Sequence, residues 1–350
     1  MTRENSLPTI AITMGDPAGI GPETIVRAWR AQFERPTWRP VVIGHPEVLA
    51  RAARQFEPSL RVMAIDEVAA TRAAPDLLPC LAACAATAAE VPPAVIDARG
   101  GQAAYDALVA AARLALAGKI DALTTAPLHK SALHLAGHHY PGHTELLAEL
   151  CGVDRFAMML YLGPGAQVRS EHGLAIVHVT LHMSLRDALA AVQTPAVLTK
   201  IHLIDEVMRR LSGVQPRIGV CALNPHAGEE GLFGDEESTI IRPAVEQARA
   251  AGFNVVGPLP ADTLIARACR GEFDAVVAMY HDQGHIAIKL LAMHRAVNVT
   301  LGLPIVRTSV AHGTAFDLAW QGRAETSGLL EALRVAARLS RGKAIGAAIQ

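Results

Sequence analysis

Residues 274–289 read Asp274-Ala275-Val276-Val277-Ala278-Met279-Tyr280-His281-Asp282-Gln283-Gly284-His285-Ile286-Ala287-Ile288-Lys289. The stretch begins with an apolar, β-branched run that predicts a short buried strand. It then changes to histidine, aspartate, glutamine and glycine, which a strand end does not need for folding. In open α/β sheets, ligands bind beyond the carboxyl ends of the strands. We therefore expect the chemistry of this protein to be placed here.

Two other strand-like runs end in the same way. Residues 173–180 lead to His182, and residues 218–223 lead to His226. With His281, these histidines match the imidazole ligands of a catalytic divalent-metal site. Zinc fits this ligand type best, and cobalt, nickel, iron or magnesium are alternatives. Three loop histidines that never converge remain an equally weighted interpretation, and His178, inside the strand, is interpreted as a core residue.

Alternating strand-like and helix-like segments predict an α/β fold with a largely parallel sheet. A chain of 350 residues is long for a single core, so two domains are expected. Because no internal repeat or low-complexity linker separates them, we predict two interleaved α/β domains with a cleft between them. The first comprises residues 1–135 and 305–350, and the second, residues 136–304, carries the metal-binding histidines.

Composition excludes several classes of protein. The chain is 51% hydrophobic and 19% charged with a formal net charge of −1, which is typical of a globular protein and not of a nucleic-acid binder. No apolar stretch is long enough to predict a membrane span, and the N-terminal residues lack the apolar segment of a signal peptide. The five cysteines are scattered, and Cys80 and Cys84 fall in an alanine-rich stretch interpreted as helical. Reduced thiols in the cytoplasm are the expectation.

A glycine-rich segment follows the first predicted strand and reads Gly15-Asp16-Pro17-Ala18-Gly19-Ile20-Gly21-Pro22-Glu23. Pro22 and Glu23 are typical of a helix start. Backbone amides at such a helix start suit an anion or a ligand carbonyl, and a tight strand-to-helix turn is an equally good interpretation. The glycine spacing matches neither the dinucleotide fingerprint nor a Walker loop.

Polar residues near and beyond residue 281 suggest substrate and catalytic roles. Lys289, Asn298 and Arg307 are donors of the kind that hold a carboxylate or phosphate. Asp282 is placed to orient an imidazole or a metal-bound water. We interpret Asp282 and Lys289 as candidate catalytic residues, although each of these side chains alone is more typical of a surface charge or a strand-end hydrogen bond.

Five phrases together resemble the 4-hydroxythreonine-4-phosphate dehydrogenase family of pyridoxal phosphate biosynthesis. The resemblance extends from residue 10 to about residue 339. The phrases are Ile12-Thr13-Met14-Gly15-Asp16-Pro17-Ala18-Gly19-Ile20-Gly21-Pro22-Glu23, Tyr140-Pro141-Gly142-His143-Thr144-Glu145, Leu223-Asn224-Pro225-His226-Ala227-Gly228-Glu229, Tyr280-His281-Asp282-Gln283-Gly284 and Arg307-Thr308-Ser309-Val310-Ala311-His312-Gly313-Thr314-Ala315.

The resemblance implies a fold like that of isocitrate and isopropylmalate dehydrogenases. It also implies a homodimer with the active site near the interface, a divalent metal, and NAD or NADP. By matching motif positions, His182, His226 and His281 are the metal ligands. The substrate-binding set is then His143, Thr144, Lys289, Asn298 and Arg307, and an adenosine-binding loop includes His312, Gly313, Ala315 and Asp317.

The implied reaction is oxidation of a β-hydroxy acid, with 4-phosphohydroxy-L-threonine as the first candidate, to a β-keto acid that decarboxylates. His285 and the phrase around His178 are similar instead to paralogues that act on threonate or erythronate 4-phosphate or on the cis-dihydrodiol of terephthalate. The loop at residues 163–173 is also longer than the family resemblance leads us to expect. Trp320 also stands where the superfamily loop commonly has glycine. A metal-dependent hydrolase and a non-catalytic binder are the alternatives from other classes.

Overall fold

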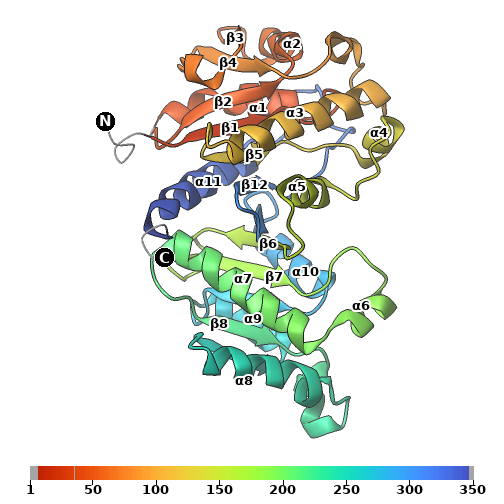
Figure 1. The fold of residues 1–350 in the computed structure, drawn as a ribbon, viewed down its shortest axis with the longest axis vertical. Helices are drawn as coiled ribbons and strands as arrows, with labels where there is room; N and C mark the ends of the chain where they lie inside the picture. Colours follow the sequence, from red (N-terminus) through yellow and green to blue (C-terminus); the bar gives the residue numbers. More distant parts are fainter. Residues whose placement is uncertain (1–6, 35, 347–350) are drawn as a thin grey trace. The chain divides into compact units, whose positions relative to one another are not determined.

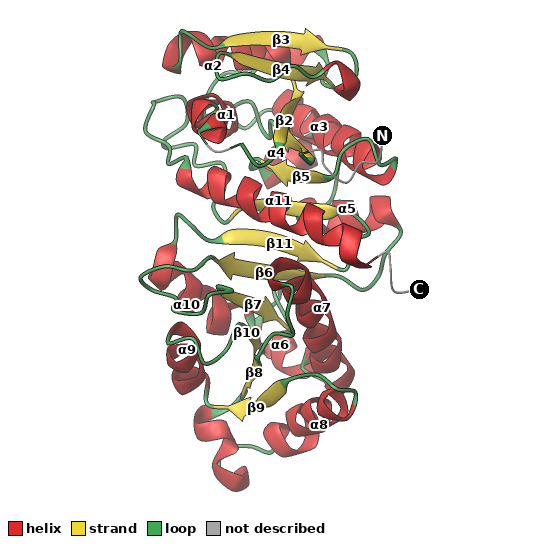
Figure 2. Ribbon diagram, turned by 90° about the vertical axis from the view of Figure 1, so that its left-hand side faces the viewer, coloured by secondary structure: helices red, strands yellow, loops and turns green. Residues whose placement is uncertain are grey.

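A computed structural model describes residues 7–34 and 36–346 (Figure 1). The chain divides into two compact units. Unit 1 contains the chain up to Asp154 together with Leu303–Arg341, and unit 2 contains Arg155–Gly302 together with the chain from Gly342 on. Helices and strands alternate in both units, which confirms the predicted α/β class (Figure 2). Residues 136–154, which the sequence analysis assigned to the second domain, lie in unit 1 because helix α5 (His143–Cys151) packs on helix α3 (Ala98–Leu116).

Unit 1 is built on a parallel sheet with the strand order β3-β4-β2-β1-β5-β12. Its strands are β1 (Thr9–Thr13), β2 (Arg39–Gly44), β3 (Arg61–Ile65), β4 (Leu77–Ala82), β5 (Ala122–Thr125) and β12 (Val306–Val310). Its other helices are α1 (Gly21–Ala28), α2 (Pro46–Phe56), α4 (Lys130–Leu135) and α11 (Ser327–Gly346). The central strands are buried along their whole length, as expected for a parallel sheet covered on both faces.

One local prediction in unit 1 is wrong. Cys80 lies in strand β4 and Cys84 in the turn after it, not in a helix. Strand β4 pairs with β2 on one side and β3 on the other, so its backbone groups are satisfied by the ladder. Tertiary pairing has therefore outweighed the helical preference of the alanines around it.

Unit 2 has a mixed sheet with the order β11-β6-β7-β10-β8-β9. Its strands are β6 (Ala157–Leu162), β7 (Leu174–His178), β8 (Ile218–Cys221), β9 (Val255–Leu259), β10 (Ala275–Ala278) and β11 (Val297–Leu301). Its helices are α6 (Leu185–Ala191), α7 (Thr194–Ser212), α8 (Arg242–Ala250), α9 (Ala261–Cys269) and α10 (His281–Ala292), with a π-helical turn at Glu237–Ile241. Strands β7, β10, β8 and β9 run parallel, whereas β11, β6 and β7 are antiparallel neighbours.

The order β7-β10-β8 positions the predicted metal ligands. These three strands are parallel neighbours, so their carboxyl ends lie at the same edge of the sheet. His182 follows β7, His281 follows β10, and His226 follows β8. The sheet therefore delivers the three segments that carry them to one edge.

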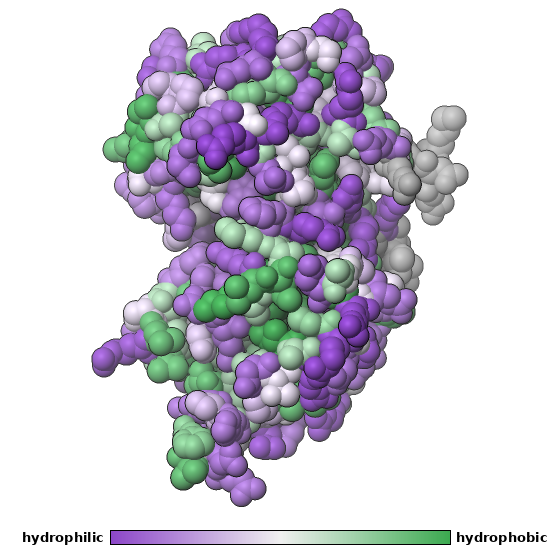
Figure 3. Space-filling view, turned by 180° about the vertical axis from the view of Figure 1, so that it is seen from behind, coloured by the Kyte–Doolittle hydropathy of each residue, from purple (hydrophilic) through white to green (hydrophobic). Residues whose placement is uncertain are grey.

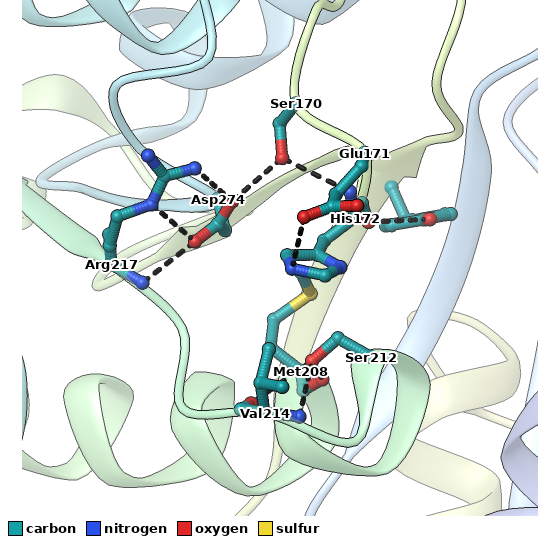
Figure 4. Close-up of polar contacts among 9 residues, drawn as sticks. Ser170, Glu171, His172, Met208, Ser212, Val214, Arg217 and Asp274 are labelled. Atoms are coloured by element: carbon teal, nitrogen blue, oxygen red, sulfur yellow. Dashed lines mark hydrogen bonds and ion pairs between the residues drawn. The ribbon is translucent and has the colours of Figure 1, made fainter.

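The amino edge of the same sheet holds a polar network (Figure 4). The Asp274 carboxylate, just before β10, accepts hydrogen bonds from the Arg217 guanidinium at 2.7 and 2.9 Å and from the Ser170 hydroxyl at 2.7 Å. It also accepts one from the Arg217 backbone N–H at 2.9 Å. The long loop at residues 163–173 is thus tied through Ser170 to the sheet. Its polar residues serve the packing of unit 2 at this edge.

Candidate active site

The carboxyl ends of the three strands in unit 2 are joined by two side chains. The Thr180 hydroxyl donates to the Met279 carbonyl at 2.9 Å, which connects the ends of β7 and β10. The Gln283 side chain accepts from the Met279 N–H at 2.7 Å and donates to the Ala222 carbonyl at 2.8 Å, which connects β10 and β8. Sequence reasoning did not assign Gln283 a role, although its place in the polar run after β10 was a signal.

His281 is the first residue of helix α10. Its Nδ1 lies 2.6 Å from Asp282 Oδ1, and its ring centroid lies 6.0 Å from that of His182. The side chain of His281 is 35% exposed, so its second nitrogen, Nε2, can reach a ligand. The structure therefore brings two of the three predicted metal ligands together.

His226 occupies a different local environment. Residues 226–230 all have positive φ, and the exposed His226 ring contacts Glu229, with 3.2 Å between Nδ1 and Oε2, and Phe233. We call residues 226–230 the left-handed turn. Within the described parts of the chain, no three His, Cys, Asp or Glu side chains form a group that could hold a metal ion. The predicted triad is therefore not brought together as a set.

The donor set still fits a metal in its chemistry. Both His281 and His226 have Nδ1 beside a carboxylate, Asp282 and Glu229 respectively, which leaves Nε2 as the ligating atom. A carboxylate on the far nitrogen of an imidazole is the usual way in which a metal-binding histidine is oriented. The place of Asp282 agrees with the orienting role suggested for it.

Two further histidines lie behind this edge. His178 ends strand β7 and His285 lies in α10, and their side-chain nitrogens Nε2 and Nδ1 are 3.1 Å apart. Burial, reinforced by the neighbouring imidazoles, lowers the pKa of His178 to about 3 and that of His285 to about 4. Both imidazoles are therefore neutral near pH 7.

Lys289 and Asn298, predicted to bind substrate, also belong to unit 2. Lys289 lies two turns beyond His281 on α10 and is exposed, and its positive charge helps to keep His285 neutral. Asn298 is the second residue of β11, and among the described residues no group is hydrogen-bonded to its buried Oδ1. A buried acceptor without a protein partner is rare, which is consistent with a ligand-binding role.

Unit 1 contributes a buried guanidinium. Arg307 is 2% exposed in β12, and its Nη2 donates to the Thr125 hydroxyl at 2.8 Å. Burial lowers the pKa of Arg307 to about 10, partly offset by the charge of Glu145. Burial and the charge of Arg307 also hold the pKa of His143 well below its usual value. His143 is thus neutral beside a buried cation, and Thr144 follows it in α5.

The predicted adenosine-binding loop lies in unit 1 and forms turns. Its Thr314 carbonyl accepts from the Ile20 N–H at 3.1 Å, and Ala315 has φ +43°. Glu23 accepts from the Ala324 N–H at 3.0 Å. The glycine-rich segment therefore supports this loop: Gly19 lies so close to Thr314 that a Cβ would be 3.1 Å from its Cβ. His312, Gly313 and Asp317 lie in the same run of turns.

Trp320 secures the far end of this loop. Its φ of +60° is a backbone conformation that favours glycine, in agreement with the glycine expected there. The indole N–H donates to the Pro17 carbonyl at 3.0 Å, and the Arg51 guanidinium lies 4.4 Å from the ring centroid. These contacts compensate for the strained backbone.

The class of protein is an α/β dehydrogenase, because relatives that align over nearly the whole chain are dehydrogenases. The chain is 46% identical over 334 residues to D-threonate 4-phosphate dehydrogenase of Salmonella typhimurium, covering 95% of this chain and 99% of the relative. It is 46% identical over 332 residues to 4-hydroxythreonine-4-phosphate dehydrogenase of Beijerinckia indica, covering 94% of each.

Solved structures agree with this class. The crystal structure of 4-hydroxythreonine-4-phosphate dehydrogenase from Klebsiella pneumoniae superposes with a TM-score of 0.84 at 42% identity, covering 95% of this chain and 99% of that one. A terephthalate 1,2-cis-dihydrodiol dehydrogenase from Burkholderia xenovorans LB400 gives 0.65 at 34% identity, covering 95% and 98%. The chain belongs to the family described as pyridoxal phosphate biosynthetic protein PdxA, which it matches over residues 36–336.

The resemblance inferred from the sequence is thus confirmed, and the chain is an oxidoreductase, which leaves the hydrolase and binder alternatives without support. No helix in the described ranges combines the length and apolar character needed to cross a membrane.

Proposed function

We propose that the protein oxidises the secondary hydroxyl of a four-carbon phosphorylated hydroxy acid, with NAD or NADP as hydride acceptor and a divalent metal bound by His182, His226 and His281. 4-Phosphohydroxy-L-threonine is the first candidate substrate and D-threonate 4-phosphate the alternative. The dehydrogenases named for these two compounds are equally similar to this chain. The two substrates share a phosphate, a carboxylate and a hydroxyl, and differ in carrying an amino or a hydroxyl group at C2.

The buried Arg307 is the observation that carries this proposal. Its guanidinium is 2% exposed, donates to the Thr125 hydroxyl at 2.8 Å, and has its charged form favoured by Glu145. A buried fork of charged N–H donors is suited to binding an anionic group of a substrate. A phosphate dianion suits the fork geometry of arginine. Neutral His143 and Thr144 add hydrogen-bonding groups without adding charge.

The side chains have different roles in the proposed reaction. Arg307, Asn298 and Lys289 bind the anionic groups of the substrate, and Asp282 holds the His281 ring through Nδ1. Lys289 is the group that moves a proton to or from the substrate oxygen. The metal, zinc in the first instance, would polarise the substrate oxygens. The dinucleotide, with its adenosine bound against residues 312–317, would supply the nicotinamide that takes up the hydride. The β-keto acid product then loses carbon dioxide.

The test is a substrate panel with purified protein, NAD or NADP and one divalent metal at a time, followed by the absorbance of reduced nicotinamide. The proposal expects turnover of 4-phosphohydroxy-L-threonine or D-threonate 4-phosphate, loss of turnover after chelation, and recovery when metal is restored. Turnover of an unphosphorylated cis-diol with no activity on either phosphate ester would overturn it.

We also infer a homodimer in the cytoplasm. Exposed apolar side chains lie at Ile286 and Leu290 of helix α10 and at Met293 just after it, spaced so that they share one face. Hydrophobic residues also gather on the surface of unit 2 in Figure 3. An exposed apolar stripe of this kind is typical of a protein–protein interface. The five cysteines are all free, which is consistent with a reducing compartment.

A further inference from the structure

Two histidines outside the predicted metal-binding, substrate-binding and cofactor-binding sets form a pair in unit 2. His178 is 1% exposed at the end of β7, and His285 is 8% exposed one turn into α10. Their ring centroids are 4.6 Å apart, and the 3.1 Å separation of Nε2 and Nδ1 is a hydrogen bond. These are also the two places where the sequence resembles the paralogues, so the two departures are one structural feature.

The helix and the strand are shaped to allow this contact. A Cβ on Gly284 would collide with His178 Nε2 and with Ile176 Cγ2, so α10 can approach β7 this closely only with glycine there. Two aliphatic side chains would fill the same core space without the cost of burying polar rings. Core packing alone therefore does not account for the pair.

His285 also contacts a predicted metal ligand. Its ring lies parallel to that of His281, with an interplanar angle of 11° and centroids 3.8 Å apart. Asp282 Oδ1 lies 2.6 Å from His281 Nδ1. The His281 ring is therefore held at one edge by Asp282 and on one face by His285, and His285 is anchored to the sheet by His178.

We propose that His178 and His285 are a positioning pair for His281, fixing the ring orientation from which Nε2 binds the metal. This inference rests on the metal site of the proposed function. Partners behind a metal ligand set its orientation, and their loss commonly weakens metal affinity by about 10- to 100-fold. The fixed ring face also sets where a metal-bound substrate sits, so the pair affects KM and kcat together.

The test distinguishes the effect of the hydrogen bond between His178 and His285 from the effect of the ring stacked on His281. His285→Phe keeps a ring against His281 but removes the bond to His178, and the double variant His178→Leu/His285→Phe removes both polar groups. Metal affinity is measured with Zn²⁺ or Co²⁺ against a chromophoric chelator, and ligand geometry by the visible absorption of the Co²⁺-loaded protein. Thermal melts monitor folding.

The single variant should bind metal about tenfold or more weakly and show an altered Co²⁺ spectrum. The double variant should recover thermal stability, because no buried imidazole lacks a partner, but not metal affinity. His202→Phe is the matched control, since His202 is a partly buried histidine of unit 2 stacked on Phe253 at 4.5 Å. It should leave affinity and spectrum unchanged.

Wild-type affinity and an unaltered Co²⁺ spectrum in the double variant would overturn the positioning role. If the single variant fails to fold, the metal affinity and Co²⁺ spectrum of the double variant test the positioning role. The same two measurements on Gly284→Ala, which retains both imidazoles but pushes them apart, are a second test. A wild-type protein that binds no divalent metal would refute the proposed metal site itself, an outcome distinct from failure of the pair.

Discussion

Arg307 shows how one residue separates the candidate substrates. We expect Arg307→Lys to raise KM for a phosphorylated substrate ten-fold or more, because lysine keeps the charge but loses the fork that holds two phosphate oxygens, a loss of about 1.4 kcal/mol or above. An unphosphorylated diol should be much less affected. Steady-state kinetics on both substrates measure this, and an unchanged KM for the phosphate ester would remove Arg307 from the binding site.

Asp16 gives a prediction about stability and pH. Burial raises the pKa of Asp16 to about 6, while its Oδ1 accepts the Ala18 N–H at 2.9 Å. Because the folded-state pKa lies above the unfolded value, the folded protein loses stability as pH rises from about 4 to above 6, by at most roughly 3 kcal/mol. Asp16→Asn retains an acceptor for Ala18 and avoids the buried charge.

We therefore expect Asp16→Asn to raise Tm at pH 8 and to have little effect near pH 4, where the wild-type carboxyl is protonated. Thermal melts across this range test the expectation. Asp262→Asn is the matched control, because Asp262 is exposed at the start of α9 and, like Asp16, accepts a hydrogen bond from a backbone N–H, that of Thr263 at 2.7 Å. Equal Tm shifts at both pH values would contradict a buried charge at Asp16.

The predictions made for single residues from the sequence relied on which residues are neighbours along the chain. Three strands that end in polar residues could be seen in the sequence, and the sheet order β7-β10-β8 makes their ends neighbours. The contact between His178 and His285 could not be seen, because it joins residues 107 positions apart through the approach of a helix to a strand. Likewise, Thr125 was not singled out as a partner of Arg307, since only the β5–β12 pairing brings them together.

At the scale of elements, the left-handed turn is the most strained segment near the site. Four of its five residues are not glycine, namely His226, Ala227, Glu229 and Glu230. A left-handed conformation costs roughly 1–2 kcal/mol for each such residue. The positive φ values were not predictable from the sequence, because only Gly228 in this turn is a residue type that favours them.

A buried carboxylate holds the turn in place. Glu237 is 3% exposed and accepts from the Leu223 and Asn224 N–H groups at 2.8 and 2.7 Å, while Oε2 accepts from the Asn224 amide at 3.0 Å. Gly228 packs so closely that a Cβ there would be 2.7 Å from Oε2. Glu237 therefore contacts the segment before the turn and the middle of the turn itself.

We expect Glu237→Gln to lower the free energy of unfolding by about 1–3 kcal/mol, because an amide nitrogen would replace an acceptor facing the Asn224 amide. Hydrogen exchange should show lost protection of the Leu223 and Asn224 amides. Glu230→Gln, an exposed glutamate in the same turn, serves as the matched control. Unchanged protection in the Glu237 variant would show that the turn holds its shape without this carboxylate.

At the scale of the molecule, the inferred dimer can be tested on α10. Leu290 is 82% exposed, so Leu290→Glu should not disturb the core of unit 2, but it would place a charge in an apolar interface. We expect the variant to shift from dimer to monomer in light scattering at assay concentration and to lose activity. Leu135→Glu, at a residue 64% exposed on α4, is the control. A wild-type protein that is monomeric and fully active would refute the dimer.

The domain division shows both the reach and the limit of sequence reasoning. Interleaving was inferred because nothing in the composition marks a linker. Unit 1 consists of the chain up to Asp154 and of Leu303–Arg341. The place of residues 136–154 was not predictable, because it depends on the packing of α5 against α3.

This division also sets an order of assembly on the ribosome. All the strands of unit 2 lie in one continuous segment, Arg155–Gly302, and can pair as soon as that segment has emerged. Strand β5 of unit 1 must wait for β12, which is made about 180 residues later. During that interval, an edge of the unit 1 sheet stays open to wrong partners. Arg307 lies on β12, so the nascent chain acquires this buried guanidinium only when β5 can gain its second neighbour.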